Sequence, residues 1–96
     1  MSELIPSRQR PLISGLITDS DRPIAHARVG VSFAPRPMPD VAAVTDENGR
    51  FSFASAGPGR HELVVVADGF SAQHVTVFVR SHPIALEVPL QPAPSS

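Results

Sequence analysis

Four histidines are the side chains of this sequence that could bind a metal ion or transfer a proton near neutral pH. They are His26, His61, His74 and His82. Two metal ligands on one strand must stand two residues apart to share a face, and no two of these histidines do. His26 lies in a predicted turn, and His82 directly precedes a proline. The sequence therefore predicts no metal site and no cofactor, and it predicts one buried histidine, His61.

The composition excludes further classes of chemistry. The 96-residue chain contains no Cys, Trp or Tyr, and all eight of its basic residues are Arg. Disulfides, thiolate nucleophiles and lysine Schiff bases are therefore unavailable. A net charge of −1 provides no basic surface for nucleic acid. No strained turn of the kind that presents a nucleophilic serine is visible. We expect a protein that is not an enzyme and has no catalytic residues.

The hydrophobic segments are too short for membrane insertion. The longest apolar run, residues 63–67, covers a small fraction of the length needed to cross a bilayer. Residues 1–10 lack the apolar core of an export signal. If Met1 is the natural start, the sequence predicts a cytoplasmic protein without a membrane partner.

Eleven prolines and six glycines divide the chain into short segments rich in β-branched residues. This spacing is typical of an all-β domain. Alternation within the segments places Val29, Val31 and Phe33 on one strand face, and Phe51 and Phe53 on another. Seven short strands cannot bury their apolar faces in one flat sheet, so they predict a two-sheet sandwich. The expected strands are 12–18, 27–33, 41–45, 50–54, 61–67, 72–80 and 84–90.

Several stretches, taken in order, resemble one family. They are Ser-Gly-Leu-Ile-Thr-Asp at 14–19, Arg-Pro-Ile-Ala-His-Ala-Arg-Val at 22–29, Thr-Asp-Glu-Asn-Gly-Arg-Phe-Ser-Phe at 45–53 and Gly-Pro-Gly-Arg-His-Glu-Leu-Val-Val-Val-Ala-Asp-Gly-Phe at 57–70. The third stretch is also a strong hairpin signal in its own right, because Asn and Gly tolerate positive φ. Together the stretches resemble the carboxypeptidase regulatory-like domain. Two positions depart from the family pattern, since His61 and Phe70 stand where Tyr is usual.

The resemblance implies a seven-stranded Greek-key β-sandwich of the transthyretin (prealbumin) type. In order along the chain, the strands would form sheets 3-2-5-6 and 4-1-7, with the first and seventh strands parallel. The implied organisation is a flexible N-terminal tail at 1–11, the domain at 12–90 and a flexible C-terminal tail at 91–96.

Enzymes with a similar fold require residues that this chain lacks. The resemblance to hydroxyisourate hydrolases would require a histidine in the first strand, an arginine in the central hairpin, a second histidine and a C-terminal Tyr-Arg-Gly-Ser. Only Arg50 occupies a comparable place. Intradiol dioxygenases bind iron through Tyr and His, and the chain has no Tyr.

The outward positions of the fifth and sixth predicted strands form the first candidate binding site. Val64 and Val66 alternate with inward residues, as do Thr76 and Phe78, so Val64, Val66 and Phe78 could form an exposed apolar patch with Thr76 beside them. The alternatives are a fully buried fifth strand and a patch covered by the N-terminal tail. The sixth strand is also an expected sheet edge, whose free amides could pair with another chain.

The proline-rich loop at 35–39 forms the second candidate site. Alternating prolines stiffen this segment, while Arg36 and Met38 offer a charge and an adaptable apolar contact beside Pro35. The alternative is a stiff connection without a binding role.

Together these features predict an accessory module that binds a partner protein or forms a homodimer. The first alternative is a purely structural module derived from a larger surface or secreted protein. A ligand- or carbohydrate-binding sandwich is the third hypothesis, and the absence of Trp and Tyr argues against it.

Overall fold

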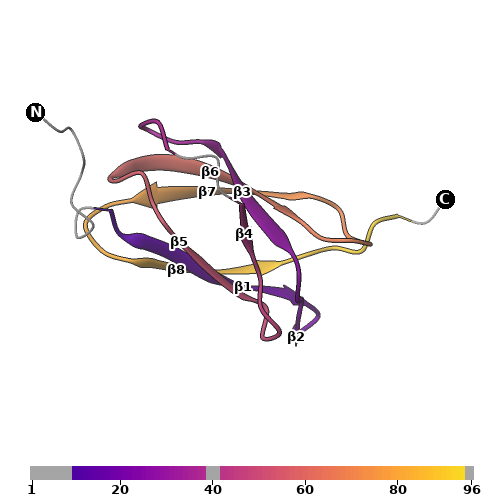
Figure 1. Cartoon of the computed structure of the whole chain (residues 1–96). Coiled ribbons are helices and arrows are strands. Elements are labelled where there is room, and N and C mark those ends of the chain that lie inside the picture. The colour runs from indigo at the N-terminus through magenta and orange to yellow at the C-terminus, as the bar shows by residue number, and fades with distance from the viewer. Residues whose placement is uncertain (1–9, 39–41, 95–96) are drawn as a thin grey trace, which may run out of the picture.

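The computed structural model describes residues 10–38 and 42–94. This part of the chain folds into strands and loops (Figure 1) and has no helix that could span a bilayer. The strands are β1 (Leu12–Asp19), β2 (Arg22–Pro23), β3 (Arg28–Phe33), β4 (Ala42–Val44), β5 (Arg50–Ala54), β6 (Gly59–Val66), β7 (Gln73–Val79) and β8 (Ile84–Pro89).

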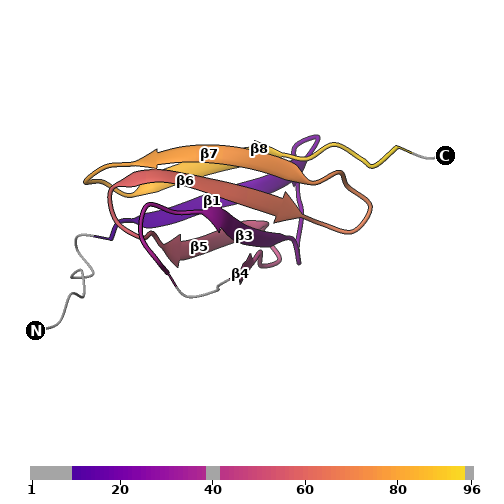
Figure 2. The ribbon, with the colours of Figure 1, turned by 90° about the horizontal axis from the view of Figure 1, so that it is seen from above.

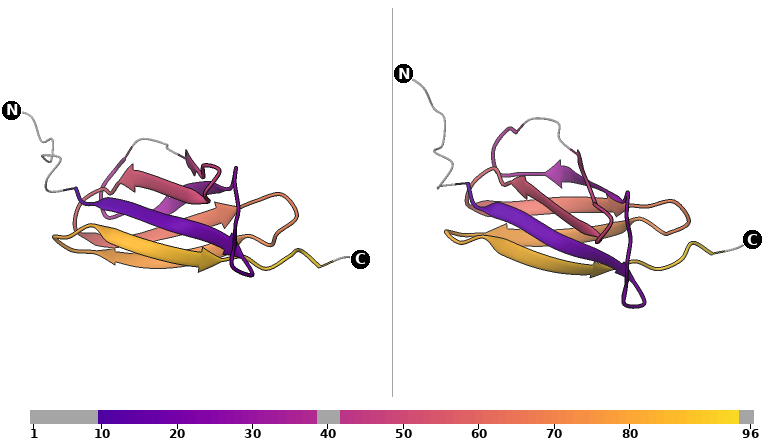
Figure 3. Two further views of the ribbon diagram at one scale, coloured as in Figure 1. Left: turned by 90° about the horizontal axis from the view of Figure 1, so that it is seen from below. Right: turned by 60° about the horizontal axis from the view of Figure 1, so that its bottom comes forward.

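The strands form the two packed sheets that were expected. One sheet has the order β4-β3-β6-β7, and all its neighbours are antiparallel. In the other sheet, β1 lies between β5, which is antiparallel to it, and β8, which is parallel to it. The view from below in Figure 3 shows β1 between these neighbours, and Figure 2 shows the two layers from above. The predicted sandwich and the parallel pairing of its first and last strands are confirmed.

The strand count of seven was wrong, because β2 adds an eighth strand between the first two expected strands, 12–18 and 27–33. Ser20 and Asp21 adopt positive φ angles of 48° and 73°. These conformations reverse the chain within two residues, as in a tight hairpin. Pro23 then pairs with Thr18 at the end of β1, beyond Leu16, the last residue of β1 that pairs with β5.

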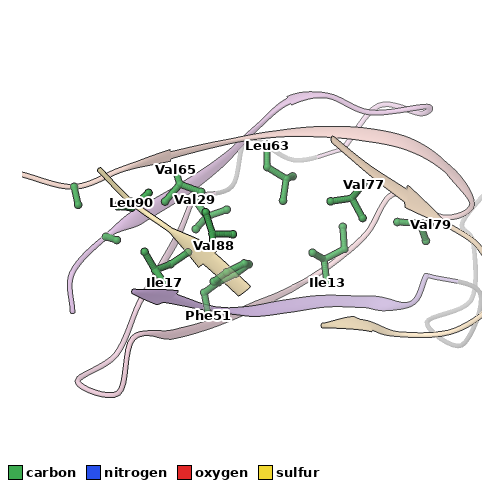
Figure 4. Close-up of a cluster of buried hydrophobic side chains, with 12 residues drawn as sticks. Ile13, Ile17, Val29, Phe51, Leu63, Val65, Val77, Val79, Val88 and Leu90 are labelled. Carbon is green, nitrogen blue, oxygen red and sulfur yellow. The ribbon is translucent and has the colours of Figure 1, made fainter. Parts of the chain in front are cut away.

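The core lies between the two sheets and consists of aliphatic side chains with one ring (Figure 4). Gly15 allows that ring to pack directly on β1, because a Cβ there would lie 2.7 Å from Cε1 of Phe51. The Phe51 and Phe53 rings stack with centroids 6.2 Å apart, as their predicted common face requires. The labelled core residues are Ile13, Ile17, Val29, Phe51, Leu63, Val65, Val77, Val79, Val88 and Leu90.

Phe33 does not share the inward face predicted for it. The register of β3 against β6 shifts between Val31 and Phe33, so a β-bulge interrupts the strict alternation. Val29 is buried, whereas Phe33 is 44% exposed. The extra residue in the bulge therefore turns the Phe33 side chain outward.

The predicted turn at 46–49 is confirmed, but its assignment as a hairpin is wrong, because the strands on either side of it, β4 and β5, pair in different sheets and not with each other. Gly49 has a φ of +74°, and its N–H donates to the Asp46 carbonyl. The Asp46 carboxylate accepts the backbone N–H groups of Arg50 and Asn48 at 3.0 and 2.8 Å. The bond from Arg50 is the main reason why the pKa of Asp46 lies below its ordinary value. The turn connects β4 of one sheet to β5 of the other.

The C-terminal segment continues to pair after β8. Ser71 N–H donates to the Gln91 carbonyl, and Ala93 N–H donates to the Gly69 carbonyl, around a bridge between Phe70 and Pro92. The predicted N-terminal tail falls almost entirely outside the described residues. The domain limits and the flexibility of both tails stay predictions.

Candidate functional site

The solvent side of the β4-β3-β6-β7 sheet, here called the outer face, carries the predicted strand-face site. Strand β6 lies inside this sheet, between β3 and β7. Its buried residues His61, Leu63 and Val65 point into the sandwich. Alternation therefore directs Val64 and Val66 to the outer face, as the sequence indicated.

The predicted residues share the outer face in two separate groups. Phe78 is 64% exposed and Val66 is 38% exposed, while Val64 is half-buried. In the register of β6 and β7, Val64 lies opposite His74 and Phe78 lies opposite Arg60. The pair of Glu62 and Thr76 separates these two rows. The two valines and Phe78 therefore do not make one continuous apolar patch.

Phe33 belongs to the Phe78 end of the outer face, and sequence reasoning missed it. The guanidinium carbon of Arg60 lies 4.5 Å from the centroid of the Phe33 ring. The Nε of Arg60 also lies 3.4 Å from a carboxylate oxygen of Glu62. These two contacts fix the Arg60 side chain between its neighbours. We call Phe33, Arg60, Glu62 and Phe78 the aromatic–arginine cluster.

Residues 35–38, the part of the proline loop that the structure describes, lie at the same end of the sheet and are attached to the loop before β6. Arg36 donates through Nη1 to the carbonyls of Ala56 and Pro58, at 3.4 and 3.2 Å. Pro35 packs over Gly59, where an added Cβ would lie 2.7 Å from the Pro35 Cβ. Met38 is half-buried, and residues 39–41 lie outside the described part of the chain. The two predicted sites are therefore neighbours, joined through Phe33 and Gly59.

His61 is buried as predicted, and both of its ring nitrogens face backbone groups. Its Nε2 accepts the N–H of Ala56 at 3.0 Å, and its Nδ1 lies 3.2 Å from the Gly59 carbonyl. This geometry requires the proton on Nδ1. Burial lowers the pKa of His61, while the bond to Gly59 opposes that shift. The imidazole is a neutral structural element that holds the 55–59 loop.

A shallow hollow of about 520 Å³ lies over the outer side of the other sheet. Its lining includes Ser14, Ser52, Ala85, Arg50 and Asp46. The Asp46 carboxylate already accepts two backbone N–H groups of the turn. Among the described residues, no group of three His, Cys, Asp or Glu is placed to hold a metal ion. The hollow thus offers small polar groups and no organised acid–base pair.

The fold and the ordered motifs together decide the family. The carboxypeptidase regulatory-like domain matches residues 12–91. This chain belongs to the carboxypeptidase regulatory-like domain family. The resemblance inferred from the four sequence stretches is confirmed. No curated protein matches the sequence.

Solved structures share this fold at low sequence identity. A DUF3823 family protein from Parabacteroides merdae has a TM-score of 0.65 and 14% identity, over 86% of this chain and 46% of its own. A chain of a type II cohesin–X–dockerin complex from Acetivibrio cellulolyticus has a TM-score of 0.63 and 21% identity, over 81% of this chain and 52% of its own. Catechol 1,2-dioxygenase from Acinetobacter sp. ADP1 has a TM-score of 0.72 and 13% identity, over 95% of this chain and 55% of its own. The chain spans about half the length of these proteins, and the similarity shows the fold alone.

Proposed function

We propose that this carboxypeptidase regulatory-like domain is a non-catalytic protein-binding module that docks through the outer face of its β4-β3-β6-β7 sheet. One observation carries the proposal. Three of the five exposed large hydrophobic side chains in the described residues, Phe33, Val66 and Phe78, lie on this face. Of the other two, Leu12 belongs to the opposite sheet, and Val44 stands on the edge strand β4 and borders the hollow. Exposed apolar side chains that gather on one face are typical of protein contacts.

The aromatic–arginine cluster is the part of this face best suited to anchor a partner. Aromatic residues and arginine are enriched among the side chains that contribute most to binding. Arg60 is already held over Phe33 and beside Glu62, so its ordering on binding costs little additional entropy. The fixed proline loop extends the same rigid surface beyond the end of β3. We therefore place the centre of the contact at Phe78 and Arg60.

The absence of catalysis is part of the proposal and has one positive support. The buried imidazole of His61 has both nitrogens engaged by backbone groups, which leaves neither free to act as a general base. A type II cohesin–X–dockerin complex contains a chain with this fold, so the fold occurs within a protein–protein assembly. The cytoplasmic location predicted from the sequence stays a prediction.

Affinity capture with matched variants tests the function. Phe78→Asp removes the most exposed of these hydrophobic side chains from the outer face. Leu12→Asp is the control, because Leu12 is 50% exposed on the other sheet. We expect wild type and Leu12→Asp to capture the same partner, and Phe78→Asp to lose it while keeping its fold. Equal capture by all three proteins would contradict the proposal.

A further inference from the structure

The free edge of β7 is the longest open strand edge in the described part of the chain. Strand β7 has seven residues, and within residues 10–38 and 42–94 it pairs only with β6. It contains no proline and no Asp, Glu, Lys or Arg. The open edge of β8, by contrast, carries Glu87 and Pro89, and β4 has only three residues. Charged residues and proline are the usual protection of an edge against pairing with another chain, and β7 lacks both.

The backbone groups that face this open edge can be identified. Thr45 N–H donates to the Ala27 carbonyl, so the backbone N–H and C=O of Ala27 face β4. Those of Val29, two residues further along the strand, face β4 as well. Gly30 then faces β6, and it lies opposite Val64. Because sides alternate along a strand, Val64 faces β3 and the residues next to it face β7. The hydrogen bond from Ser32 Oγ to the Glu62 carbonyl agrees with this assignment.

The same alternation continues into β7. His74, Thr76 and Phe78 lie opposite Val64, Glu62 and Arg60 of β6, residues that face away from β7. The N–H and C=O groups of His74, Thr76 and Phe78 therefore point to the open edge. Thr76 is the midpoint of Gln73–Val79. A two-fold axis at Thr76 would thus allow every residue of the strand to find a partner in a second copy.

We infer that β7 pairs antiparallel with β7 of a second copy about this two-fold axis, which joins the two sheets into one. The inference rests on the proposed protein-binding function and names its partner. In this register Thr76 lies opposite Thr76 of the second copy, and these two residues exchange two N–H···O=C bonds. Phe78 lies beside His74 of the second copy, and Val75 lies beside Val77. No like charges meet along the pairing.

The distribution of charge favours the antiparallel arrangement. The end of the sandwich where β6 begins and β7 finishes carries four arginines against Glu62 in the described residues. Those arginines are Arg10, Arg36, Arg60 and Arg80. The opposite end is acidic: among the described residues it has six carboxylates and three arginines. The carboxylates are Asp19, Asp21, Asp46, Glu47, Asp68 and Glu87, and the arginines are Arg22, Arg28 and Arg50.

Antiparallel pairing of β7 places the basic end of each copy beside the acidic end of the other. Arg80 would lie across from Ala72 of the second copy, next to the turn that contains Asp68. Parallel alignment of the two copies would instead bring like charges together. The charge pattern therefore selects a second copy in the orientation that the two-fold axis at Thr76 requires.

Sedimentation equilibrium of the purified chain tests the pairing. Thr76→Pro removes the central N–H from the open edge without removing a bond to β6, and Thr76→Ala is the control that keeps this N–H. We expect wild type and Thr76→Ala to dimerise with similar dissociation constants. Thr76→Pro should raise the dissociation constant at least about tenfold. Salt should weaken the wild-type dimer because the opposed ends are exposed. A wild type that stays monomeric, or an unaffected folded Thr76→Pro variant, would overturn the inference.

A cysteine variant tests the inference even if Thr76→Pro fails to fold. Opposed residues of a hydrogen-bonded antiparallel pair have Cα atoms about 5.5 Å apart, within disulfide range. The chain has no cysteine, so Thr76→Cys should give one cross-linked dimer on oxidation. Ala85→Cys, exposed on β8 of the other sheet, should cross-link much more slowly. Equal rates would overturn the pairing.

If the pairing fails but capture of a different protein still depends on Phe78, the proposed binding function survives with another partner.

Discussion

The backbone N–H of Ala56 donates to Nε2 of the fully buried His61, at 3.0 Å. The bond crosses the turn between β5 and β6 and ties the 55–59 loop to the start of β6. The same loop accepts the two hydrogen bonds of Arg36. One neutral imidazole thus supports, through this loop, the end of the sheet that carries the aromatic–arginine cluster.

The free energy of unfolding should decrease as the pH falls below about 6.5, the ordinary pKa of histidine. Burial lowers the pKa of His61 in the folded state, so below 6.5 the unfolded chain binds a proton that the folded chain does not. The stabilisation by neutral His61 is therefore complete above 6.5 and is lost as the pH falls through the folded pKa. Urea unfolding between neutral and mildly acidic pH measures the effect.

The matched variant for this prediction is His61→Gln, which keeps a polar side chain but does not titrate. Its free energy of unfolding should be lower than that of wild type at neutral pH and should change less between neutral and mildly acidic pH. An unchanged pH dependence in His61→Gln would show that other groups cause the effect.

Substitution of three glycines by alanine should separate backbone strain from steric overlap. At Gly49, φ is +74° and an added Cβ would lie 2.8 Å from the Ile17 carbonyl oxygen, so Gly49→Ala should be the most destabilising change. Gly69 has a φ of +85° but open space around it, and Gly69→Ala should cost about 1 kcal/mol. Gly30 has neither constraint, and Gly30→Ala should be neutral or stabilise by up to about 1 kcal/mol. Thermal unfolding gives the order, and a Gly30→Ala variant as unstable as Gly49→Ala would refute this account.

Arg36→Ala should release the proline loop from the 55–59 loop. The variant loses the two hydrogen bonds to the Ala56 and Pro58 carbonyls, and we expect a stability loss of about 1 kcal/mol. Amide hydrogen exchange should accelerate in both loops and stay unchanged in β8. Arg36→Lys is the control that keeps the charge, and it should restore exchange protection only in part. Unchanged exchange in Arg36→Ala would show that prolines alone hold the loop.

The sequence predicted the sheets because alternation and turn chemistry act locally. The alternation of β6 and β7 indicated correctly which side chains point outward, and Asn48-Gly49 marked the turn between β4 and β5, although these strands belong to different sheets. Two features were not predictable in this way. The bulge that turns Phe33 outward depends on the register between β3 and β6, which strand alternation alone does not specify. The strand β2 depends on positive φ angles at Ser20 and Asp21, which neither residue type requires.

The composition of the outer face was predicted only in part, for the same reason. The separation of Val64 from Phe78 follows from the opposed pair Glu62 and Thr76, and thus from the register of two strands. The contact between Arg60 and Phe33 joins side chains far apart in the sequence and arises only after the bulge forms. Sequence patterns identified the correct face but not the cluster within it.

The most direct test of the binding face is a methyl NMR titration of the labelled domain with the protein that it captures. The account predicts that the methyl signal of Thr76, two residues from Phe78 on the same face, shifts or broadens on binding, with a smaller change at Val64, while the methyl signals of Leu12 and Leu16 on the other sheet stay in place. The opposite pattern, with changes confined to Leu12, Leu16 and the hollow above Ser14, would contradict the account and move the binding site to the β5-β1-β8 sheet.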